Sequence, residues 1–148
     1  MAKDEKQKRS LVFLDASVII AAILSPRGGS SRVLSESKMR GFHLITSLYA
    51  YEESFTALQQ KYPHFLGRLR SSSLSFELIE NPPEDFYKQF SAVIDSKDLV
   101  IIASAVAAKT NVLLTLDKKH FLLNRKLRKQ VAPLAIMTPG DFIQKYFL

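Results

Sequence analysis

Apolar residues along the chain gather in two kinds of segment. Short, continuous apolar runs, such as 11–14 and 112–116, are typical of strands buried on both faces of a parallel sheet. Longer segments, such as 47–61 and 97–109, have the length and the apolar spacing of helices. Residues 75–79 instead alternate polar and apolar side chains, which predicts an exposed edge strand.

Predicted strands alternate with predicted helices over nearly the whole chain. This alternation predicts βαβ units with right-handed crossovers, and therefore a three-layer α/β/α domain with a mostly parallel sheet over residues 11–148. Residues 1–10, which are polar and rich in basic side chains, are expected to form a disordered tail. The remaining predicted strands are 42–46 and 134–137, and the remaining helices are 17–24, 30–39, a short segment up to residue 70, 84–94 and 141–147.

Several helix ends carry local signals. Ser30 or Ser31 is expected to cap the second helix, and Gly41 is expected to end it. Asp95 or Ser96 is expected to cap the most apolar helix of the chain. These signals set the expected boundaries of the segments that surround the candidate site.

The net charge of the chain indicates the kind of partner that it binds. It carries 21 Lys and Arg residues against 14 Asp and Glu residues, a formal net charge of +7 at pH 7. Such a balance favours a polyanionic partner, because neutralising phosphates drives association with nucleic acid. Basic residues gather in the N-terminal tail, in 61–70 and in 118–129, although each cluster taken alone also fits a solubilising surface.

The composition also excludes several classes of protein. The sequence contains no cysteine, which excludes disulfides, thiolate zinc sites and cysteine nucleophiles and fits the cytoplasm. No apolar stretch reaches the roughly 18 residues that span a bilayer, so no membrane partner is expected. The basic N-terminus leads into a predicted strand, not into the apolar core of a signal peptide.

Four acidic residues fall where chemistry is expected in such a fold. Asp15 and Asp117 directly follow predicted strands, Asp98 lies in the first turn of the most apolar helix, and Glu53 lies about two turns into the helix after 42–46. Ligands of open α/β sheets bind outside the carboxyl ends of the strands, so these four carboxylates can converge there. Carboxylates that close stay ionised only around a cation, and oxygen ligands favour Mg²⁺ or Mn²⁺.

Each acid also has a structural alternative. Asp15 and Asp117 could end their strands or cap the segments that follow. Asp98 could serve the helix dipole at the third position of its helix, with Asp95 as the cap. Glu52 competes with Glu53, because the amphipathic phase of the helix does not separate them.

The order and spacing of these residues resemble a known family. The segments Val12–Asp15 with Ser17, Thr46–Ser47 with Glu53, Lys97–Asp98, and Leu114–Phe121 together resemble the PIN domain, in particular the VapC-like toxins of bacterial and archaeal toxin–antitoxin pairs. The resemblance implies a metal-dependent ribonuclease that is commonly dimeric and often held inactive by an antitoxin. It also implies a five-stranded sheet of order 3-2-1-4-5. By this likeness Asp15, Glu53, Asp98 and Asp117 form the acidic quartet, and Ser17 and Thr115 match the small hydroxyl positions beside it.

The sequence departs from the family after the last acid. Many relatives carry a further acid there, whereas this chain has Lys118, Lys119 and His120, which predicts one tightly held ion and a second recruited by substrate phosphate. His120 is a candidate acid or base, although surface histidines are common. Basic residues expected to contact RNA are Lys118, Lys119, Arg125 and Lys126.

These observations lead to one main hypothesis, a Mg²⁺- or Mn²⁺-dependent endoribonuclease that acts as the toxin of a toxin–antitoxin pair. The alternative is a non-catalytic RNA-binding module of the same fold. A phosphatase of the haloacid dehalogenase type is disfavoured, because Ser17 stands where that chemistry needs a second Asp. A homodimer is expected, and its candidate contacts are the aromatic residues Phe86, Tyr87 and Phe90, or Phe142, Tyr146 and Phe147, which could equally be core.

Overall fold

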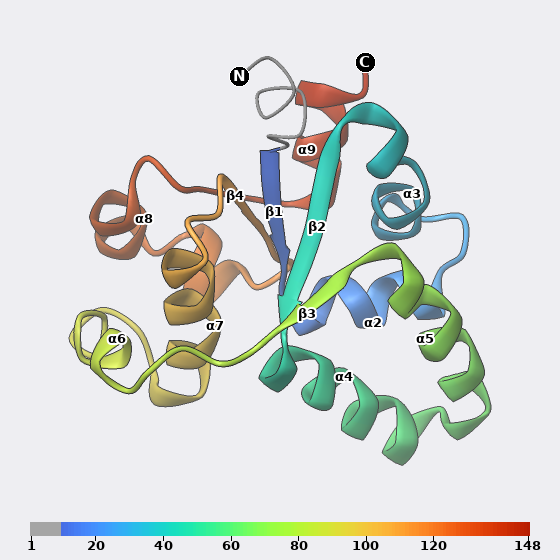
Figure 1. Ribbon diagram of the computed structural model, residues 1–148, viewed down its shortest axis with the longest axis horizontal. Coiled ribbons are helices and arrows are strands. Elements are labelled where there is room, and N and C mark those ends of the chain that lie inside the picture. Colours follow the sequence, from blue (N-terminus) through green and yellow to red (C-terminus); the bar gives the residue numbers. More distant parts are fainter. Residues whose placement is uncertain (1–9) are drawn as a thin grey trace, which may run out of the picture.

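A computed structural model describes residues 10–148 as five strands surrounded by helices (Figure 1). The strands are β1 (Ser10–Leu14), β2 (Phe42–Ser47), β3 (Glu77–Ile79), β4 (Val112–Leu114) and β5 (Ala135–Met137). The helices are α2 (Ala16–Leu24), α3 (Gly29–Glu36), α4 (Leu48–Lys61), α5 (Leu66–Ser72), α6 (Asp85–Lys88), α7 (Ser96–Ala107), α8 (Arg125–Val131) and α9 (Pro139–Tyr146). Short helical turns are η1 (Lys38–Arg40), η2 (Pro63–Phe65), η3 (Ser73–Ser75) and η4 (Lys118–Leu122).

The five strands form one sheet of order β3-β2-β1-β4-β5, and all four pairings are parallel. This confirms the expected α/β class and the order 3-2-1-4-5. The central strand β1 pairs with β2 on one side and with β4 on the other, where Leu14 lies opposite Leu114. This register brings the residues that follow β1 and β4 next to each other at the carboxyl end of the sheet.

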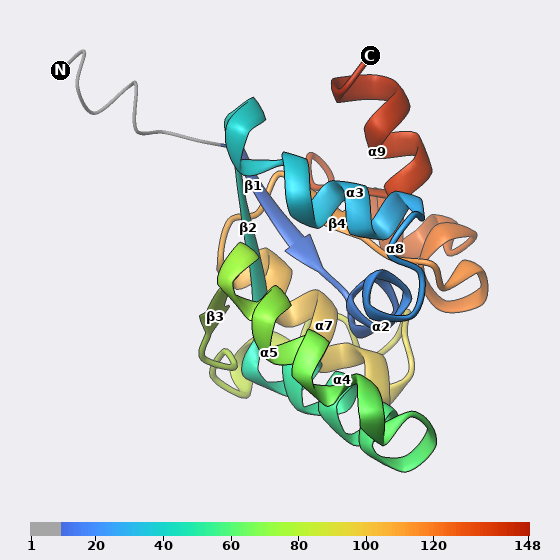
Figure 2. The same cartoon turned by 90° about the vertical axis from the view of Figure 1, so that its right-hand side faces the viewer.

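Two hydrophobic cores flank the sheet, as the side chains of β1 illustrate. Val12 and Leu14 point into one core, and Phe13 between them points into the other. Helices α2, α3, α5 and α9 cover the first face, and α6, α7 and α8 cover the second (Figures 1 and 2). Helix α4 runs below the carboxyl end of β1 and β2. The three layers predicted from the sequence are therefore present.

The segment predicted as one helix over 84–94 contains only the single turn α6. The chain continues in turns that carry Phe90 and Ile94 into the core. Side chains from the following layer take up carbonyl groups of this segment: Gln130 donates to the Gln89 oxygen at 2.6 Å, and Asn124 donates to the Val93 oxygen at 2.7 Å. The prediction of a continuous helix was wrong because these contacts are long-range and replace the helical hydrogen bonds.

Helix α8 was not predicted. Most of its residues are basic or polar, and only Leu127 and Val131 are buried, one turn apart. Asn124 begins the helix by accepting a hydrogen bond from the Leu127 amide at 3.1 Å. Two apolar positions are too few for the pattern along the sequence to reveal a helix.

The expected cap at Ser30 or Ser31 is also wrong. Helix α3 starts earlier, with Gly28 as its N-terminal cap, and the Ser31 hydroxyl donates to the carbonyl oxygens of Ala22 at 2.6 Å and Ser25 at 2.8 Å. The hydroxyl therefore serves the end of α2 and not the start of α3. Gly41 ends η1 with a φ of 90°, as predicted for a glycine at a left-handed position.

Of the expected tail at 1–10, residues 1–9 lie outside the described residues, and Ser10 is the first residue of β1. Within 10–148, no helix is both long enough and apolar enough to cross a bilayer. The two aromatic groups considered for a dimer contact belong largely to the cores. Phe90, Phe142 and Phe147 are buried, and Phe86 and Tyr87 pack against the second core.

Candidate metal centre

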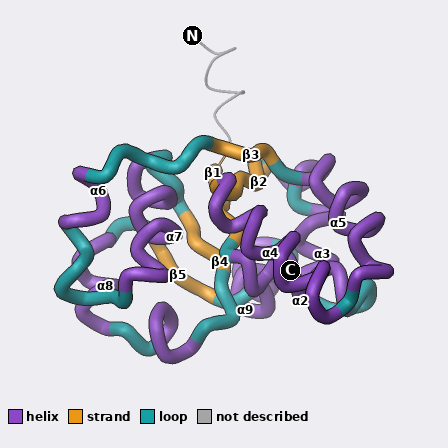
Figure 3. Tube along the Cα trace, turned by 90° about the horizontal axis from the view of Figure 1, so that it is seen from below, coloured by secondary structure: helices purple, strands orange, loops and turns teal. Residues whose placement is uncertain are grey.

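The candidate site lies where β1 and β4 end side by side. The Asp15 amide donates to the Leu114 oxygen at 3.0 Å, so the parallel pairing continues to the last residue before the site. Asp15 follows β1 directly, and Asp117 follows β4 after two further residues. Seen from below in Figure 3, β4 lies between α7 and α4. The topology therefore brings the two strand-end aspartates together, as their positions in the sequence predict.

Asp15 is held in place by two hydroxyl groups. Its Oδ2 accepts hydrogen bonds from Ser17 Oγ at 2.8 Å and from Thr115 Oγ1 at 2.7 Å. The side chain is only 7% exposed, and this burial raises the pKa of its carboxyl group against the effect of the two hydroxyls. Asp15 also occupies the N-cap position of α2, but without a side-chain capping bond. Its carboxylate therefore faces the site and does not serve the helix.

The two hydroxyl residues connect the strand ends to each other. Besides donating to Asp15, Ser17 Oγ accepts from the Leu116 amide at 3.1 Å, and Thr115 Oγ1 accepts from the Asp117 amide at 3.1 Å. Each hydroxyl therefore donates to Asp15 and accepts from a backbone amide that follows β4. A fixed carboxylate orientation is what a metal ligand needs.

Glu53 projects from α4, which Ser47 caps by accepting a hydrogen bond from the Ala50 amide at 3.1 Å. The pKa of Glu53 is raised to about 7, chiefly by partial burial and then by the charges of Asp15 and Asp98. Glu53 therefore lies close enough to Asp15 and Asp98 for their charges to act on it. The Tyr49 hydroxyl donates to the Lys97 oxygen at 3.3 Å and ties α4 to the start of α7.

Asp98 is the third residue of α7, whose N-cap is Asp95. Its Oδ2 is the one fully buried side-chain oxygen or nitrogen within 10–148 that has no hydrogen-bond partner. Burial raises the pKa of this carboxyl group, the charges of Asp117 and Asp15 add to the effect, and His120 opposes it. An unpaired buried oxygen is costly unless something absent from the protein itself pairs with it. A cation is such a partner.

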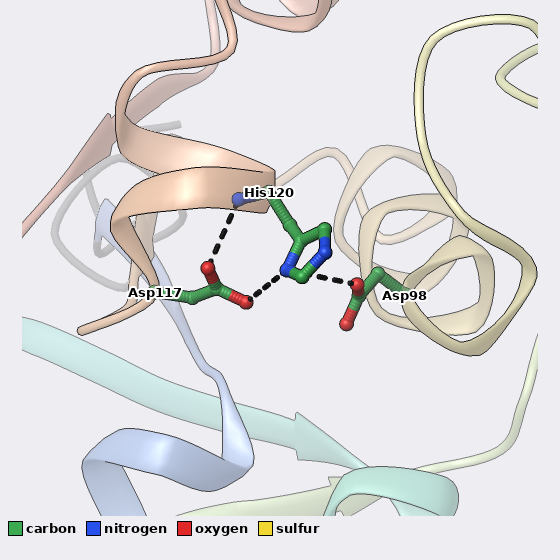
Figure 4. A group of neighbouring side chains, drawn as sticks. All are labelled: Asp98, Asp117 and His120. Carbon is green, nitrogen blue, oxygen red and sulfur yellow. Dashed lines mark hydrogen bonds and ion pairs between the residues drawn. The ribbon is translucent and has the colours of Figure 1, made fainter.

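Asp117 is bound by His120, one turn further along η4 (Figure 4). Its Oδ1 accepts from the His120 amide at 2.9 Å, and its Oδ2 lies 2.9 Å from His120 Nδ1. Burial acts to raise the pKa of Asp117, but the hydrogen bonds from His120 outweigh it and leave the pKa lowered. Asp117 is thus the acid of the group that stays ionised most readily.

His120 also lies close to two further acids. Its Nδ1 is 3.7 Å from Asp98 Oδ2, and its Nε2 is 3.3 Å from Asp95 Oδ2. Asp95 makes no side-chain capping bond to α7, and its carboxylate lies beside the imidazole instead. Ligand atoms of Asp98, Asp117 and His120 all lie within 4.8 Å of one another, close enough to share one ion.

Two residues near the acids were not among the predicted site residues. Lys97 lies close enough for its charge to lower the pKa values of Glu53, Asp98 and Asp117. The only feature of the sequence that could have pointed to Lys97 as a neighbour of the acids was its position directly before Asp98. His120 was considered only as an acid or base, since nothing local shows that α7 lies against η4.

The four basic residues expected to contact RNA are all exposed, but they are not all equally near the acids. Lys118 and Lys119 belong to η4, directly after Asp117, whereas Arg125 and Lys126 begin α8. Their role in RNA binding stays a prediction.

The donors at this edge fit a divalent cation. Carboxylate oxygens suit hard ions such as Mg²⁺ and Mn²⁺, and the group includes a buried carboxylate oxygen that lacks a hydrogen bond. The charge of Asp117 raises the pKa values of Asp15 and Asp98, and the charges of Asp15 and Asp98 raise the pKa of Glu53. Such repulsion is relieved when positive charge lies among the carboxylates.

Comparisons with known proteins give a family match and structural similarity. A family model described as PIN domain matches residues 11–119. Comparison with curated protein sequences gives no match. Among solved structures, VapBC2 from Rickettsia felis bound to a DNA fragment from its promoter is similar to this chain, with a TM-score of 0.67 and 18% identity over 85% of this chain and 96% of that one.

Two further structures are similar over comparable lengths. VapBC-1 from nontypeable Haemophilus influenzae has a TM-score of 0.61 and 16% identity over 88% of this chain and 98% of that one. VapC20 from Mycobacterium tuberculosis, a toxin that cleaves the sarcin–ricin loop, has a TM-score of 0.56 and 16% identity over 73% of this chain and 91% of that one. At these identities the similarity concerns the fold.

Proposed function

Because the chain belongs to the PIN domain family, whose model matches residues 11–119, we propose that it is a Mg²⁺- or Mn²⁺-dependent endoribonuclease. The observation that carries the proposal is the buried Oδ2 of Asp98, which has no hydrogen-bond partner and lies among carboxylates that repel one another. A structure that keeps such an arrangement without a structural benefit is expected to use it for binding a cation.

The four acids of the quartet and the two hydroxyl residues beside Asp15 have different roles in the proposed site. Asp15, Asp98, Asp117 and Glu53 would hold the metal, and Ser17 and Thr115 would fix the orientation of Asp15 through their hydrogen bonds to its Oδ2. A bound divalent ion supplies a Lewis acid and lowers the pKa of water for attack on a phosphodiester. In the metal-free protein the pKa of Glu53 is raised to about 7, and a cation bound among the acids would favour its ionised form.

RNA is the proposed substrate. A net charge of +7 favours binding to a polyphosphate chain, and Lys97, Lys118 and Lys119 carry exposed positive charge beside or near the acids. Arg125 and Lys126 extend this charge along α8. The similarity in fold to a toxin that cleaves the sarcin–ricin loop supports RNA as the class of substrate.

We further propose that the protein acts as the toxin of a toxin–antitoxin pair, in the cytoplasm, where its RNA would be found. The similarity in fold to two VapBC structures supports an antitoxin partner. The homodimer implied by the family resemblance stays a prediction, which sedimentation of the purified protein can test. Growth arrest on expression, relieved when the antitoxin is co-expressed, is the expected result for a toxin.

Cleavage of a mixed structured RNA tests the enzyme proposal. The purified protein is assayed with Mn²⁺, with Mg²⁺ and with EDTA, beside Asp98→Asn and a matched Asp141→Asn control on the exposed start of α9. We expect cleavage that requires metal, is lost in Asp98→Asn and is kept in Asp141→Asn. No cleavage by any protein, together with tight and salt-sensitive RNA binding, would instead favour the non-catalytic RNA-binding module.

A further inference from the structure

We propose that His120 is a ligand of the cation at this edge, through Nδ1, and that it makes the site prefer Mn²⁺ over Mg²⁺. The inference rests on the proposed function, since it concerns the same metal. It assigns a role to the segment after Asp117, where the sequence carries Lys118, Lys119 and His120 in place of the acid expected from the family.

The distances fit shared coordination. His120 Nδ1 lies 2.9 Å from Asp117 Oδ2 and 3.7 Å from Asp98 Oδ2 (Figure 4). Ligand atoms that are each ~2.1 Å from one ion lie about 3 Å apart when adjacent and about 4 Å apart when opposite. The imidazole therefore already lies at ligand spacing from the two carboxylate oxygens, with only small movements needed to admit an ion.

The second ring nitrogen supports the same role. His120 Nε2 lies 3.3 Å from Asp95 Oδ2, and the Asp95 side chain makes no capping hydrogen bond to α7. Histidines that bind metals commonly direct their other nitrogen at a carboxylate, which fixes the tautomer and the ring orientation. When the ring proton lies on Nε2, toward Asp95, Nδ1 no longer donates to Asp117 Oδ2, and its lone pair is directed at the region between Asp98 and Asp117.

A role limited to holding Asp117 would not need the ring. The backbone amide of His120 already donates to Asp117 Oδ1 at 2.9 Å. The ring leaves Asp98 Oδ2, 3.7 Å from Nδ1, without a hydrogen bond, although this oxygen is buried. One cation between Asp98, Asp117 and His120 would be coordinated by Asp98 Oδ2, which lacks a hydrogen bond, and by the lone pair of His120 Nδ1.

The nature of the ligand leads to the selectivity. Mg²⁺ favours an all-oxygen environment and keeps several waters, whereas imidazole nitrogen binds first-row transition ions such as Mn²⁺ more readily. An acid at this position would instead supply a carboxylate oxygen, a ligand that suits Mg²⁺ and Mn²⁺ equally well. The exchange of that acid for His120 therefore shifts preference toward Mn²⁺.

Pulsed electron paramagnetic resonance of bound Mn²⁺ tests the assignment, because directly bound imidazole nitrogen couples to the manganese electron spin. The chain contains three histidines in all, so a His43→Gln/His64→Gln double variant, prepared without a histidine tag, leaves His120 as its only imidazole. His43 pairs with Glu77 and His64 lies against Phe65, both outside the acid group. We expect the nitrogen coupling in the wild type and in this double variant, and its loss in His120→Asn.

Calorimetric titration with Mn²⁺ and with Mg²⁺ measures the selectivity. His120→Asn keeps an amide near the position of Nδ1, able to hold Asp117, but removes the imidazole. We expect the ratio of Mn²⁺ to Mg²⁺ affinity to fall ~10-fold in His120→Asn. Melting curves of the metal-free proteins show whether His120→Asn folds. The nitrogen coupling of the His43→Gln/His64→Gln variant is measured with His120 intact, so it tests the assignment even if His120→Asn does not fold.

The outcomes separate the two proposals. Mn²⁺ that binds the wild type without nitrogen coupling, or with unchanged selectivity in His120→Asn, would overturn the ligand role of His120 and leave the ribonuclease proposal standing. Affinities for Mn²⁺ and Mg²⁺ that fall by the same factor in His120→Asn would assign His120 to positioning Asp117 only. A wild type that binds neither Mn²⁺ nor Mg²⁺ would overturn both proposals.

Discussion

The two sides of the carboxyl edge hold their acids in different ways. On the β1 side, Asp15 is buried and receives two neutral hydroxyl donors, Ser17 and Thr115, on one oxygen. On the α7 side, Asp98 keeps a buried oxygen without any hydrogen bond, and Asp117 depends on His120. The first side is organised by the protein itself, whereas the second lacks a partner that a cation can provide. The contrast indicates where the ion is needed most and which contacts are in place before it binds.

Removing the acid of the organised side is expected to have the largest effect. Asp15→Asn keeps the shape of the side chain but removes a charge that a divalent ion requires, so RNA cleavage should fall at least ~100-fold. RNA affinity should stay within about twofold, since basic residues supply it. Cleavage rates and binding curves check both statements.

The Asp141→Asn variant is the control for this change, because it removes an equal charge from an exposed position on α9. Cleavage by Asp15→Asn at the rate of this control would show that Asp15 is not part of the site.

A smaller effect is expected when the support of Asp15 is removed. Thr115→Val has nearly the same volume but takes the donor from Asp15 Oδ2 and the acceptor from the Asp117 amide. We expect a loss of about 1–3 kcal/mol in the free energy of unfolding and a decrease of about tenfold in cleavage. Urea denaturation and kinetics measure the two.

Thr115→Ser keeps the hydroxyl and should retain most of both properties. Ser17→Ala, at a less buried position, should cost less than Thr115→Val. If Thr115→Ser were as impaired as Thr115→Val, packing of the methyl group and not the hydrogen bonds would be the cause.

Charge on η4 should affect binding without affecting the metal. Lys118→Gln/Lys119→Gln removes two exposed cations that follow Asp117. RNA affinity should decrease ~5-fold and depend less on salt, because fewer counterions are released. Mn²⁺ affinity measured by calorimetry should change little. Equal losses in Arg125→Gln/Lys126→Gln would extend the RNA-binding surface to α8, and none in either variant would remove these residues from it.

The smallest effect concerns Glu53 and appears as a pH dependence of stability. Its pKa is about 7 in the folded protein and about 4.5 when unfolded, so the folded state binds the proton more tightly. Without metal, stability should therefore decrease as the pH rises from about 4.5 to about 7. Because Glu53 is largely exposed, the effect should be about 1 kcal/mol or less.

Glu53→Gln removes this titration, so in EDTA the variant should be more stable than the wild type at pH 8 and equally stable near pH 4.5. Denaturation curves at the two pH values check the sign. A variant that keeps the full pH dependence would show that Glu53 does not face the other acids.

Much of the fold could be predicted from the sequence because its strands are short, buried and continuous. Leu11–Leu14 and Val112–Leu114 are apolar throughout, so the residues that follow them, Asp15 and Asp117, could be expected at one edge. The single turn α6 could not be predicted, since side chains distant in the sequence take up carbonyl groups of the segment that follows it. The polar helix α8 could not be predicted because only Leu127 and Val131 of its residues are buried.

The same limit applies to the site. Ser17 and Thr115 were expected beside the acids from the family resemblance, and both donate hydrogen bonds to Asp15. The role of His120 depends on the approach of η4 to α7, which brings it to Asp98 and Asp95 from more than twenty positions away. Patterns along the chain carry no information on that approach. The choice of Glu53 over Glu52 came from the family resemblance, and the sequence does not show that α4 packs near the start of α7.

Anomalous diffraction from crystals grown with Mn²⁺ shows whether this edge binds a divalent cation. We expect an anomalous peak within coordination distance of Asp98 Oδ2 and of the carboxylates of Asp15 and Asp117. A crystal in which Mn²⁺ binds elsewhere, while Asp98 Oδ2 stays unpaired at saturating Mn²⁺, would contradict it.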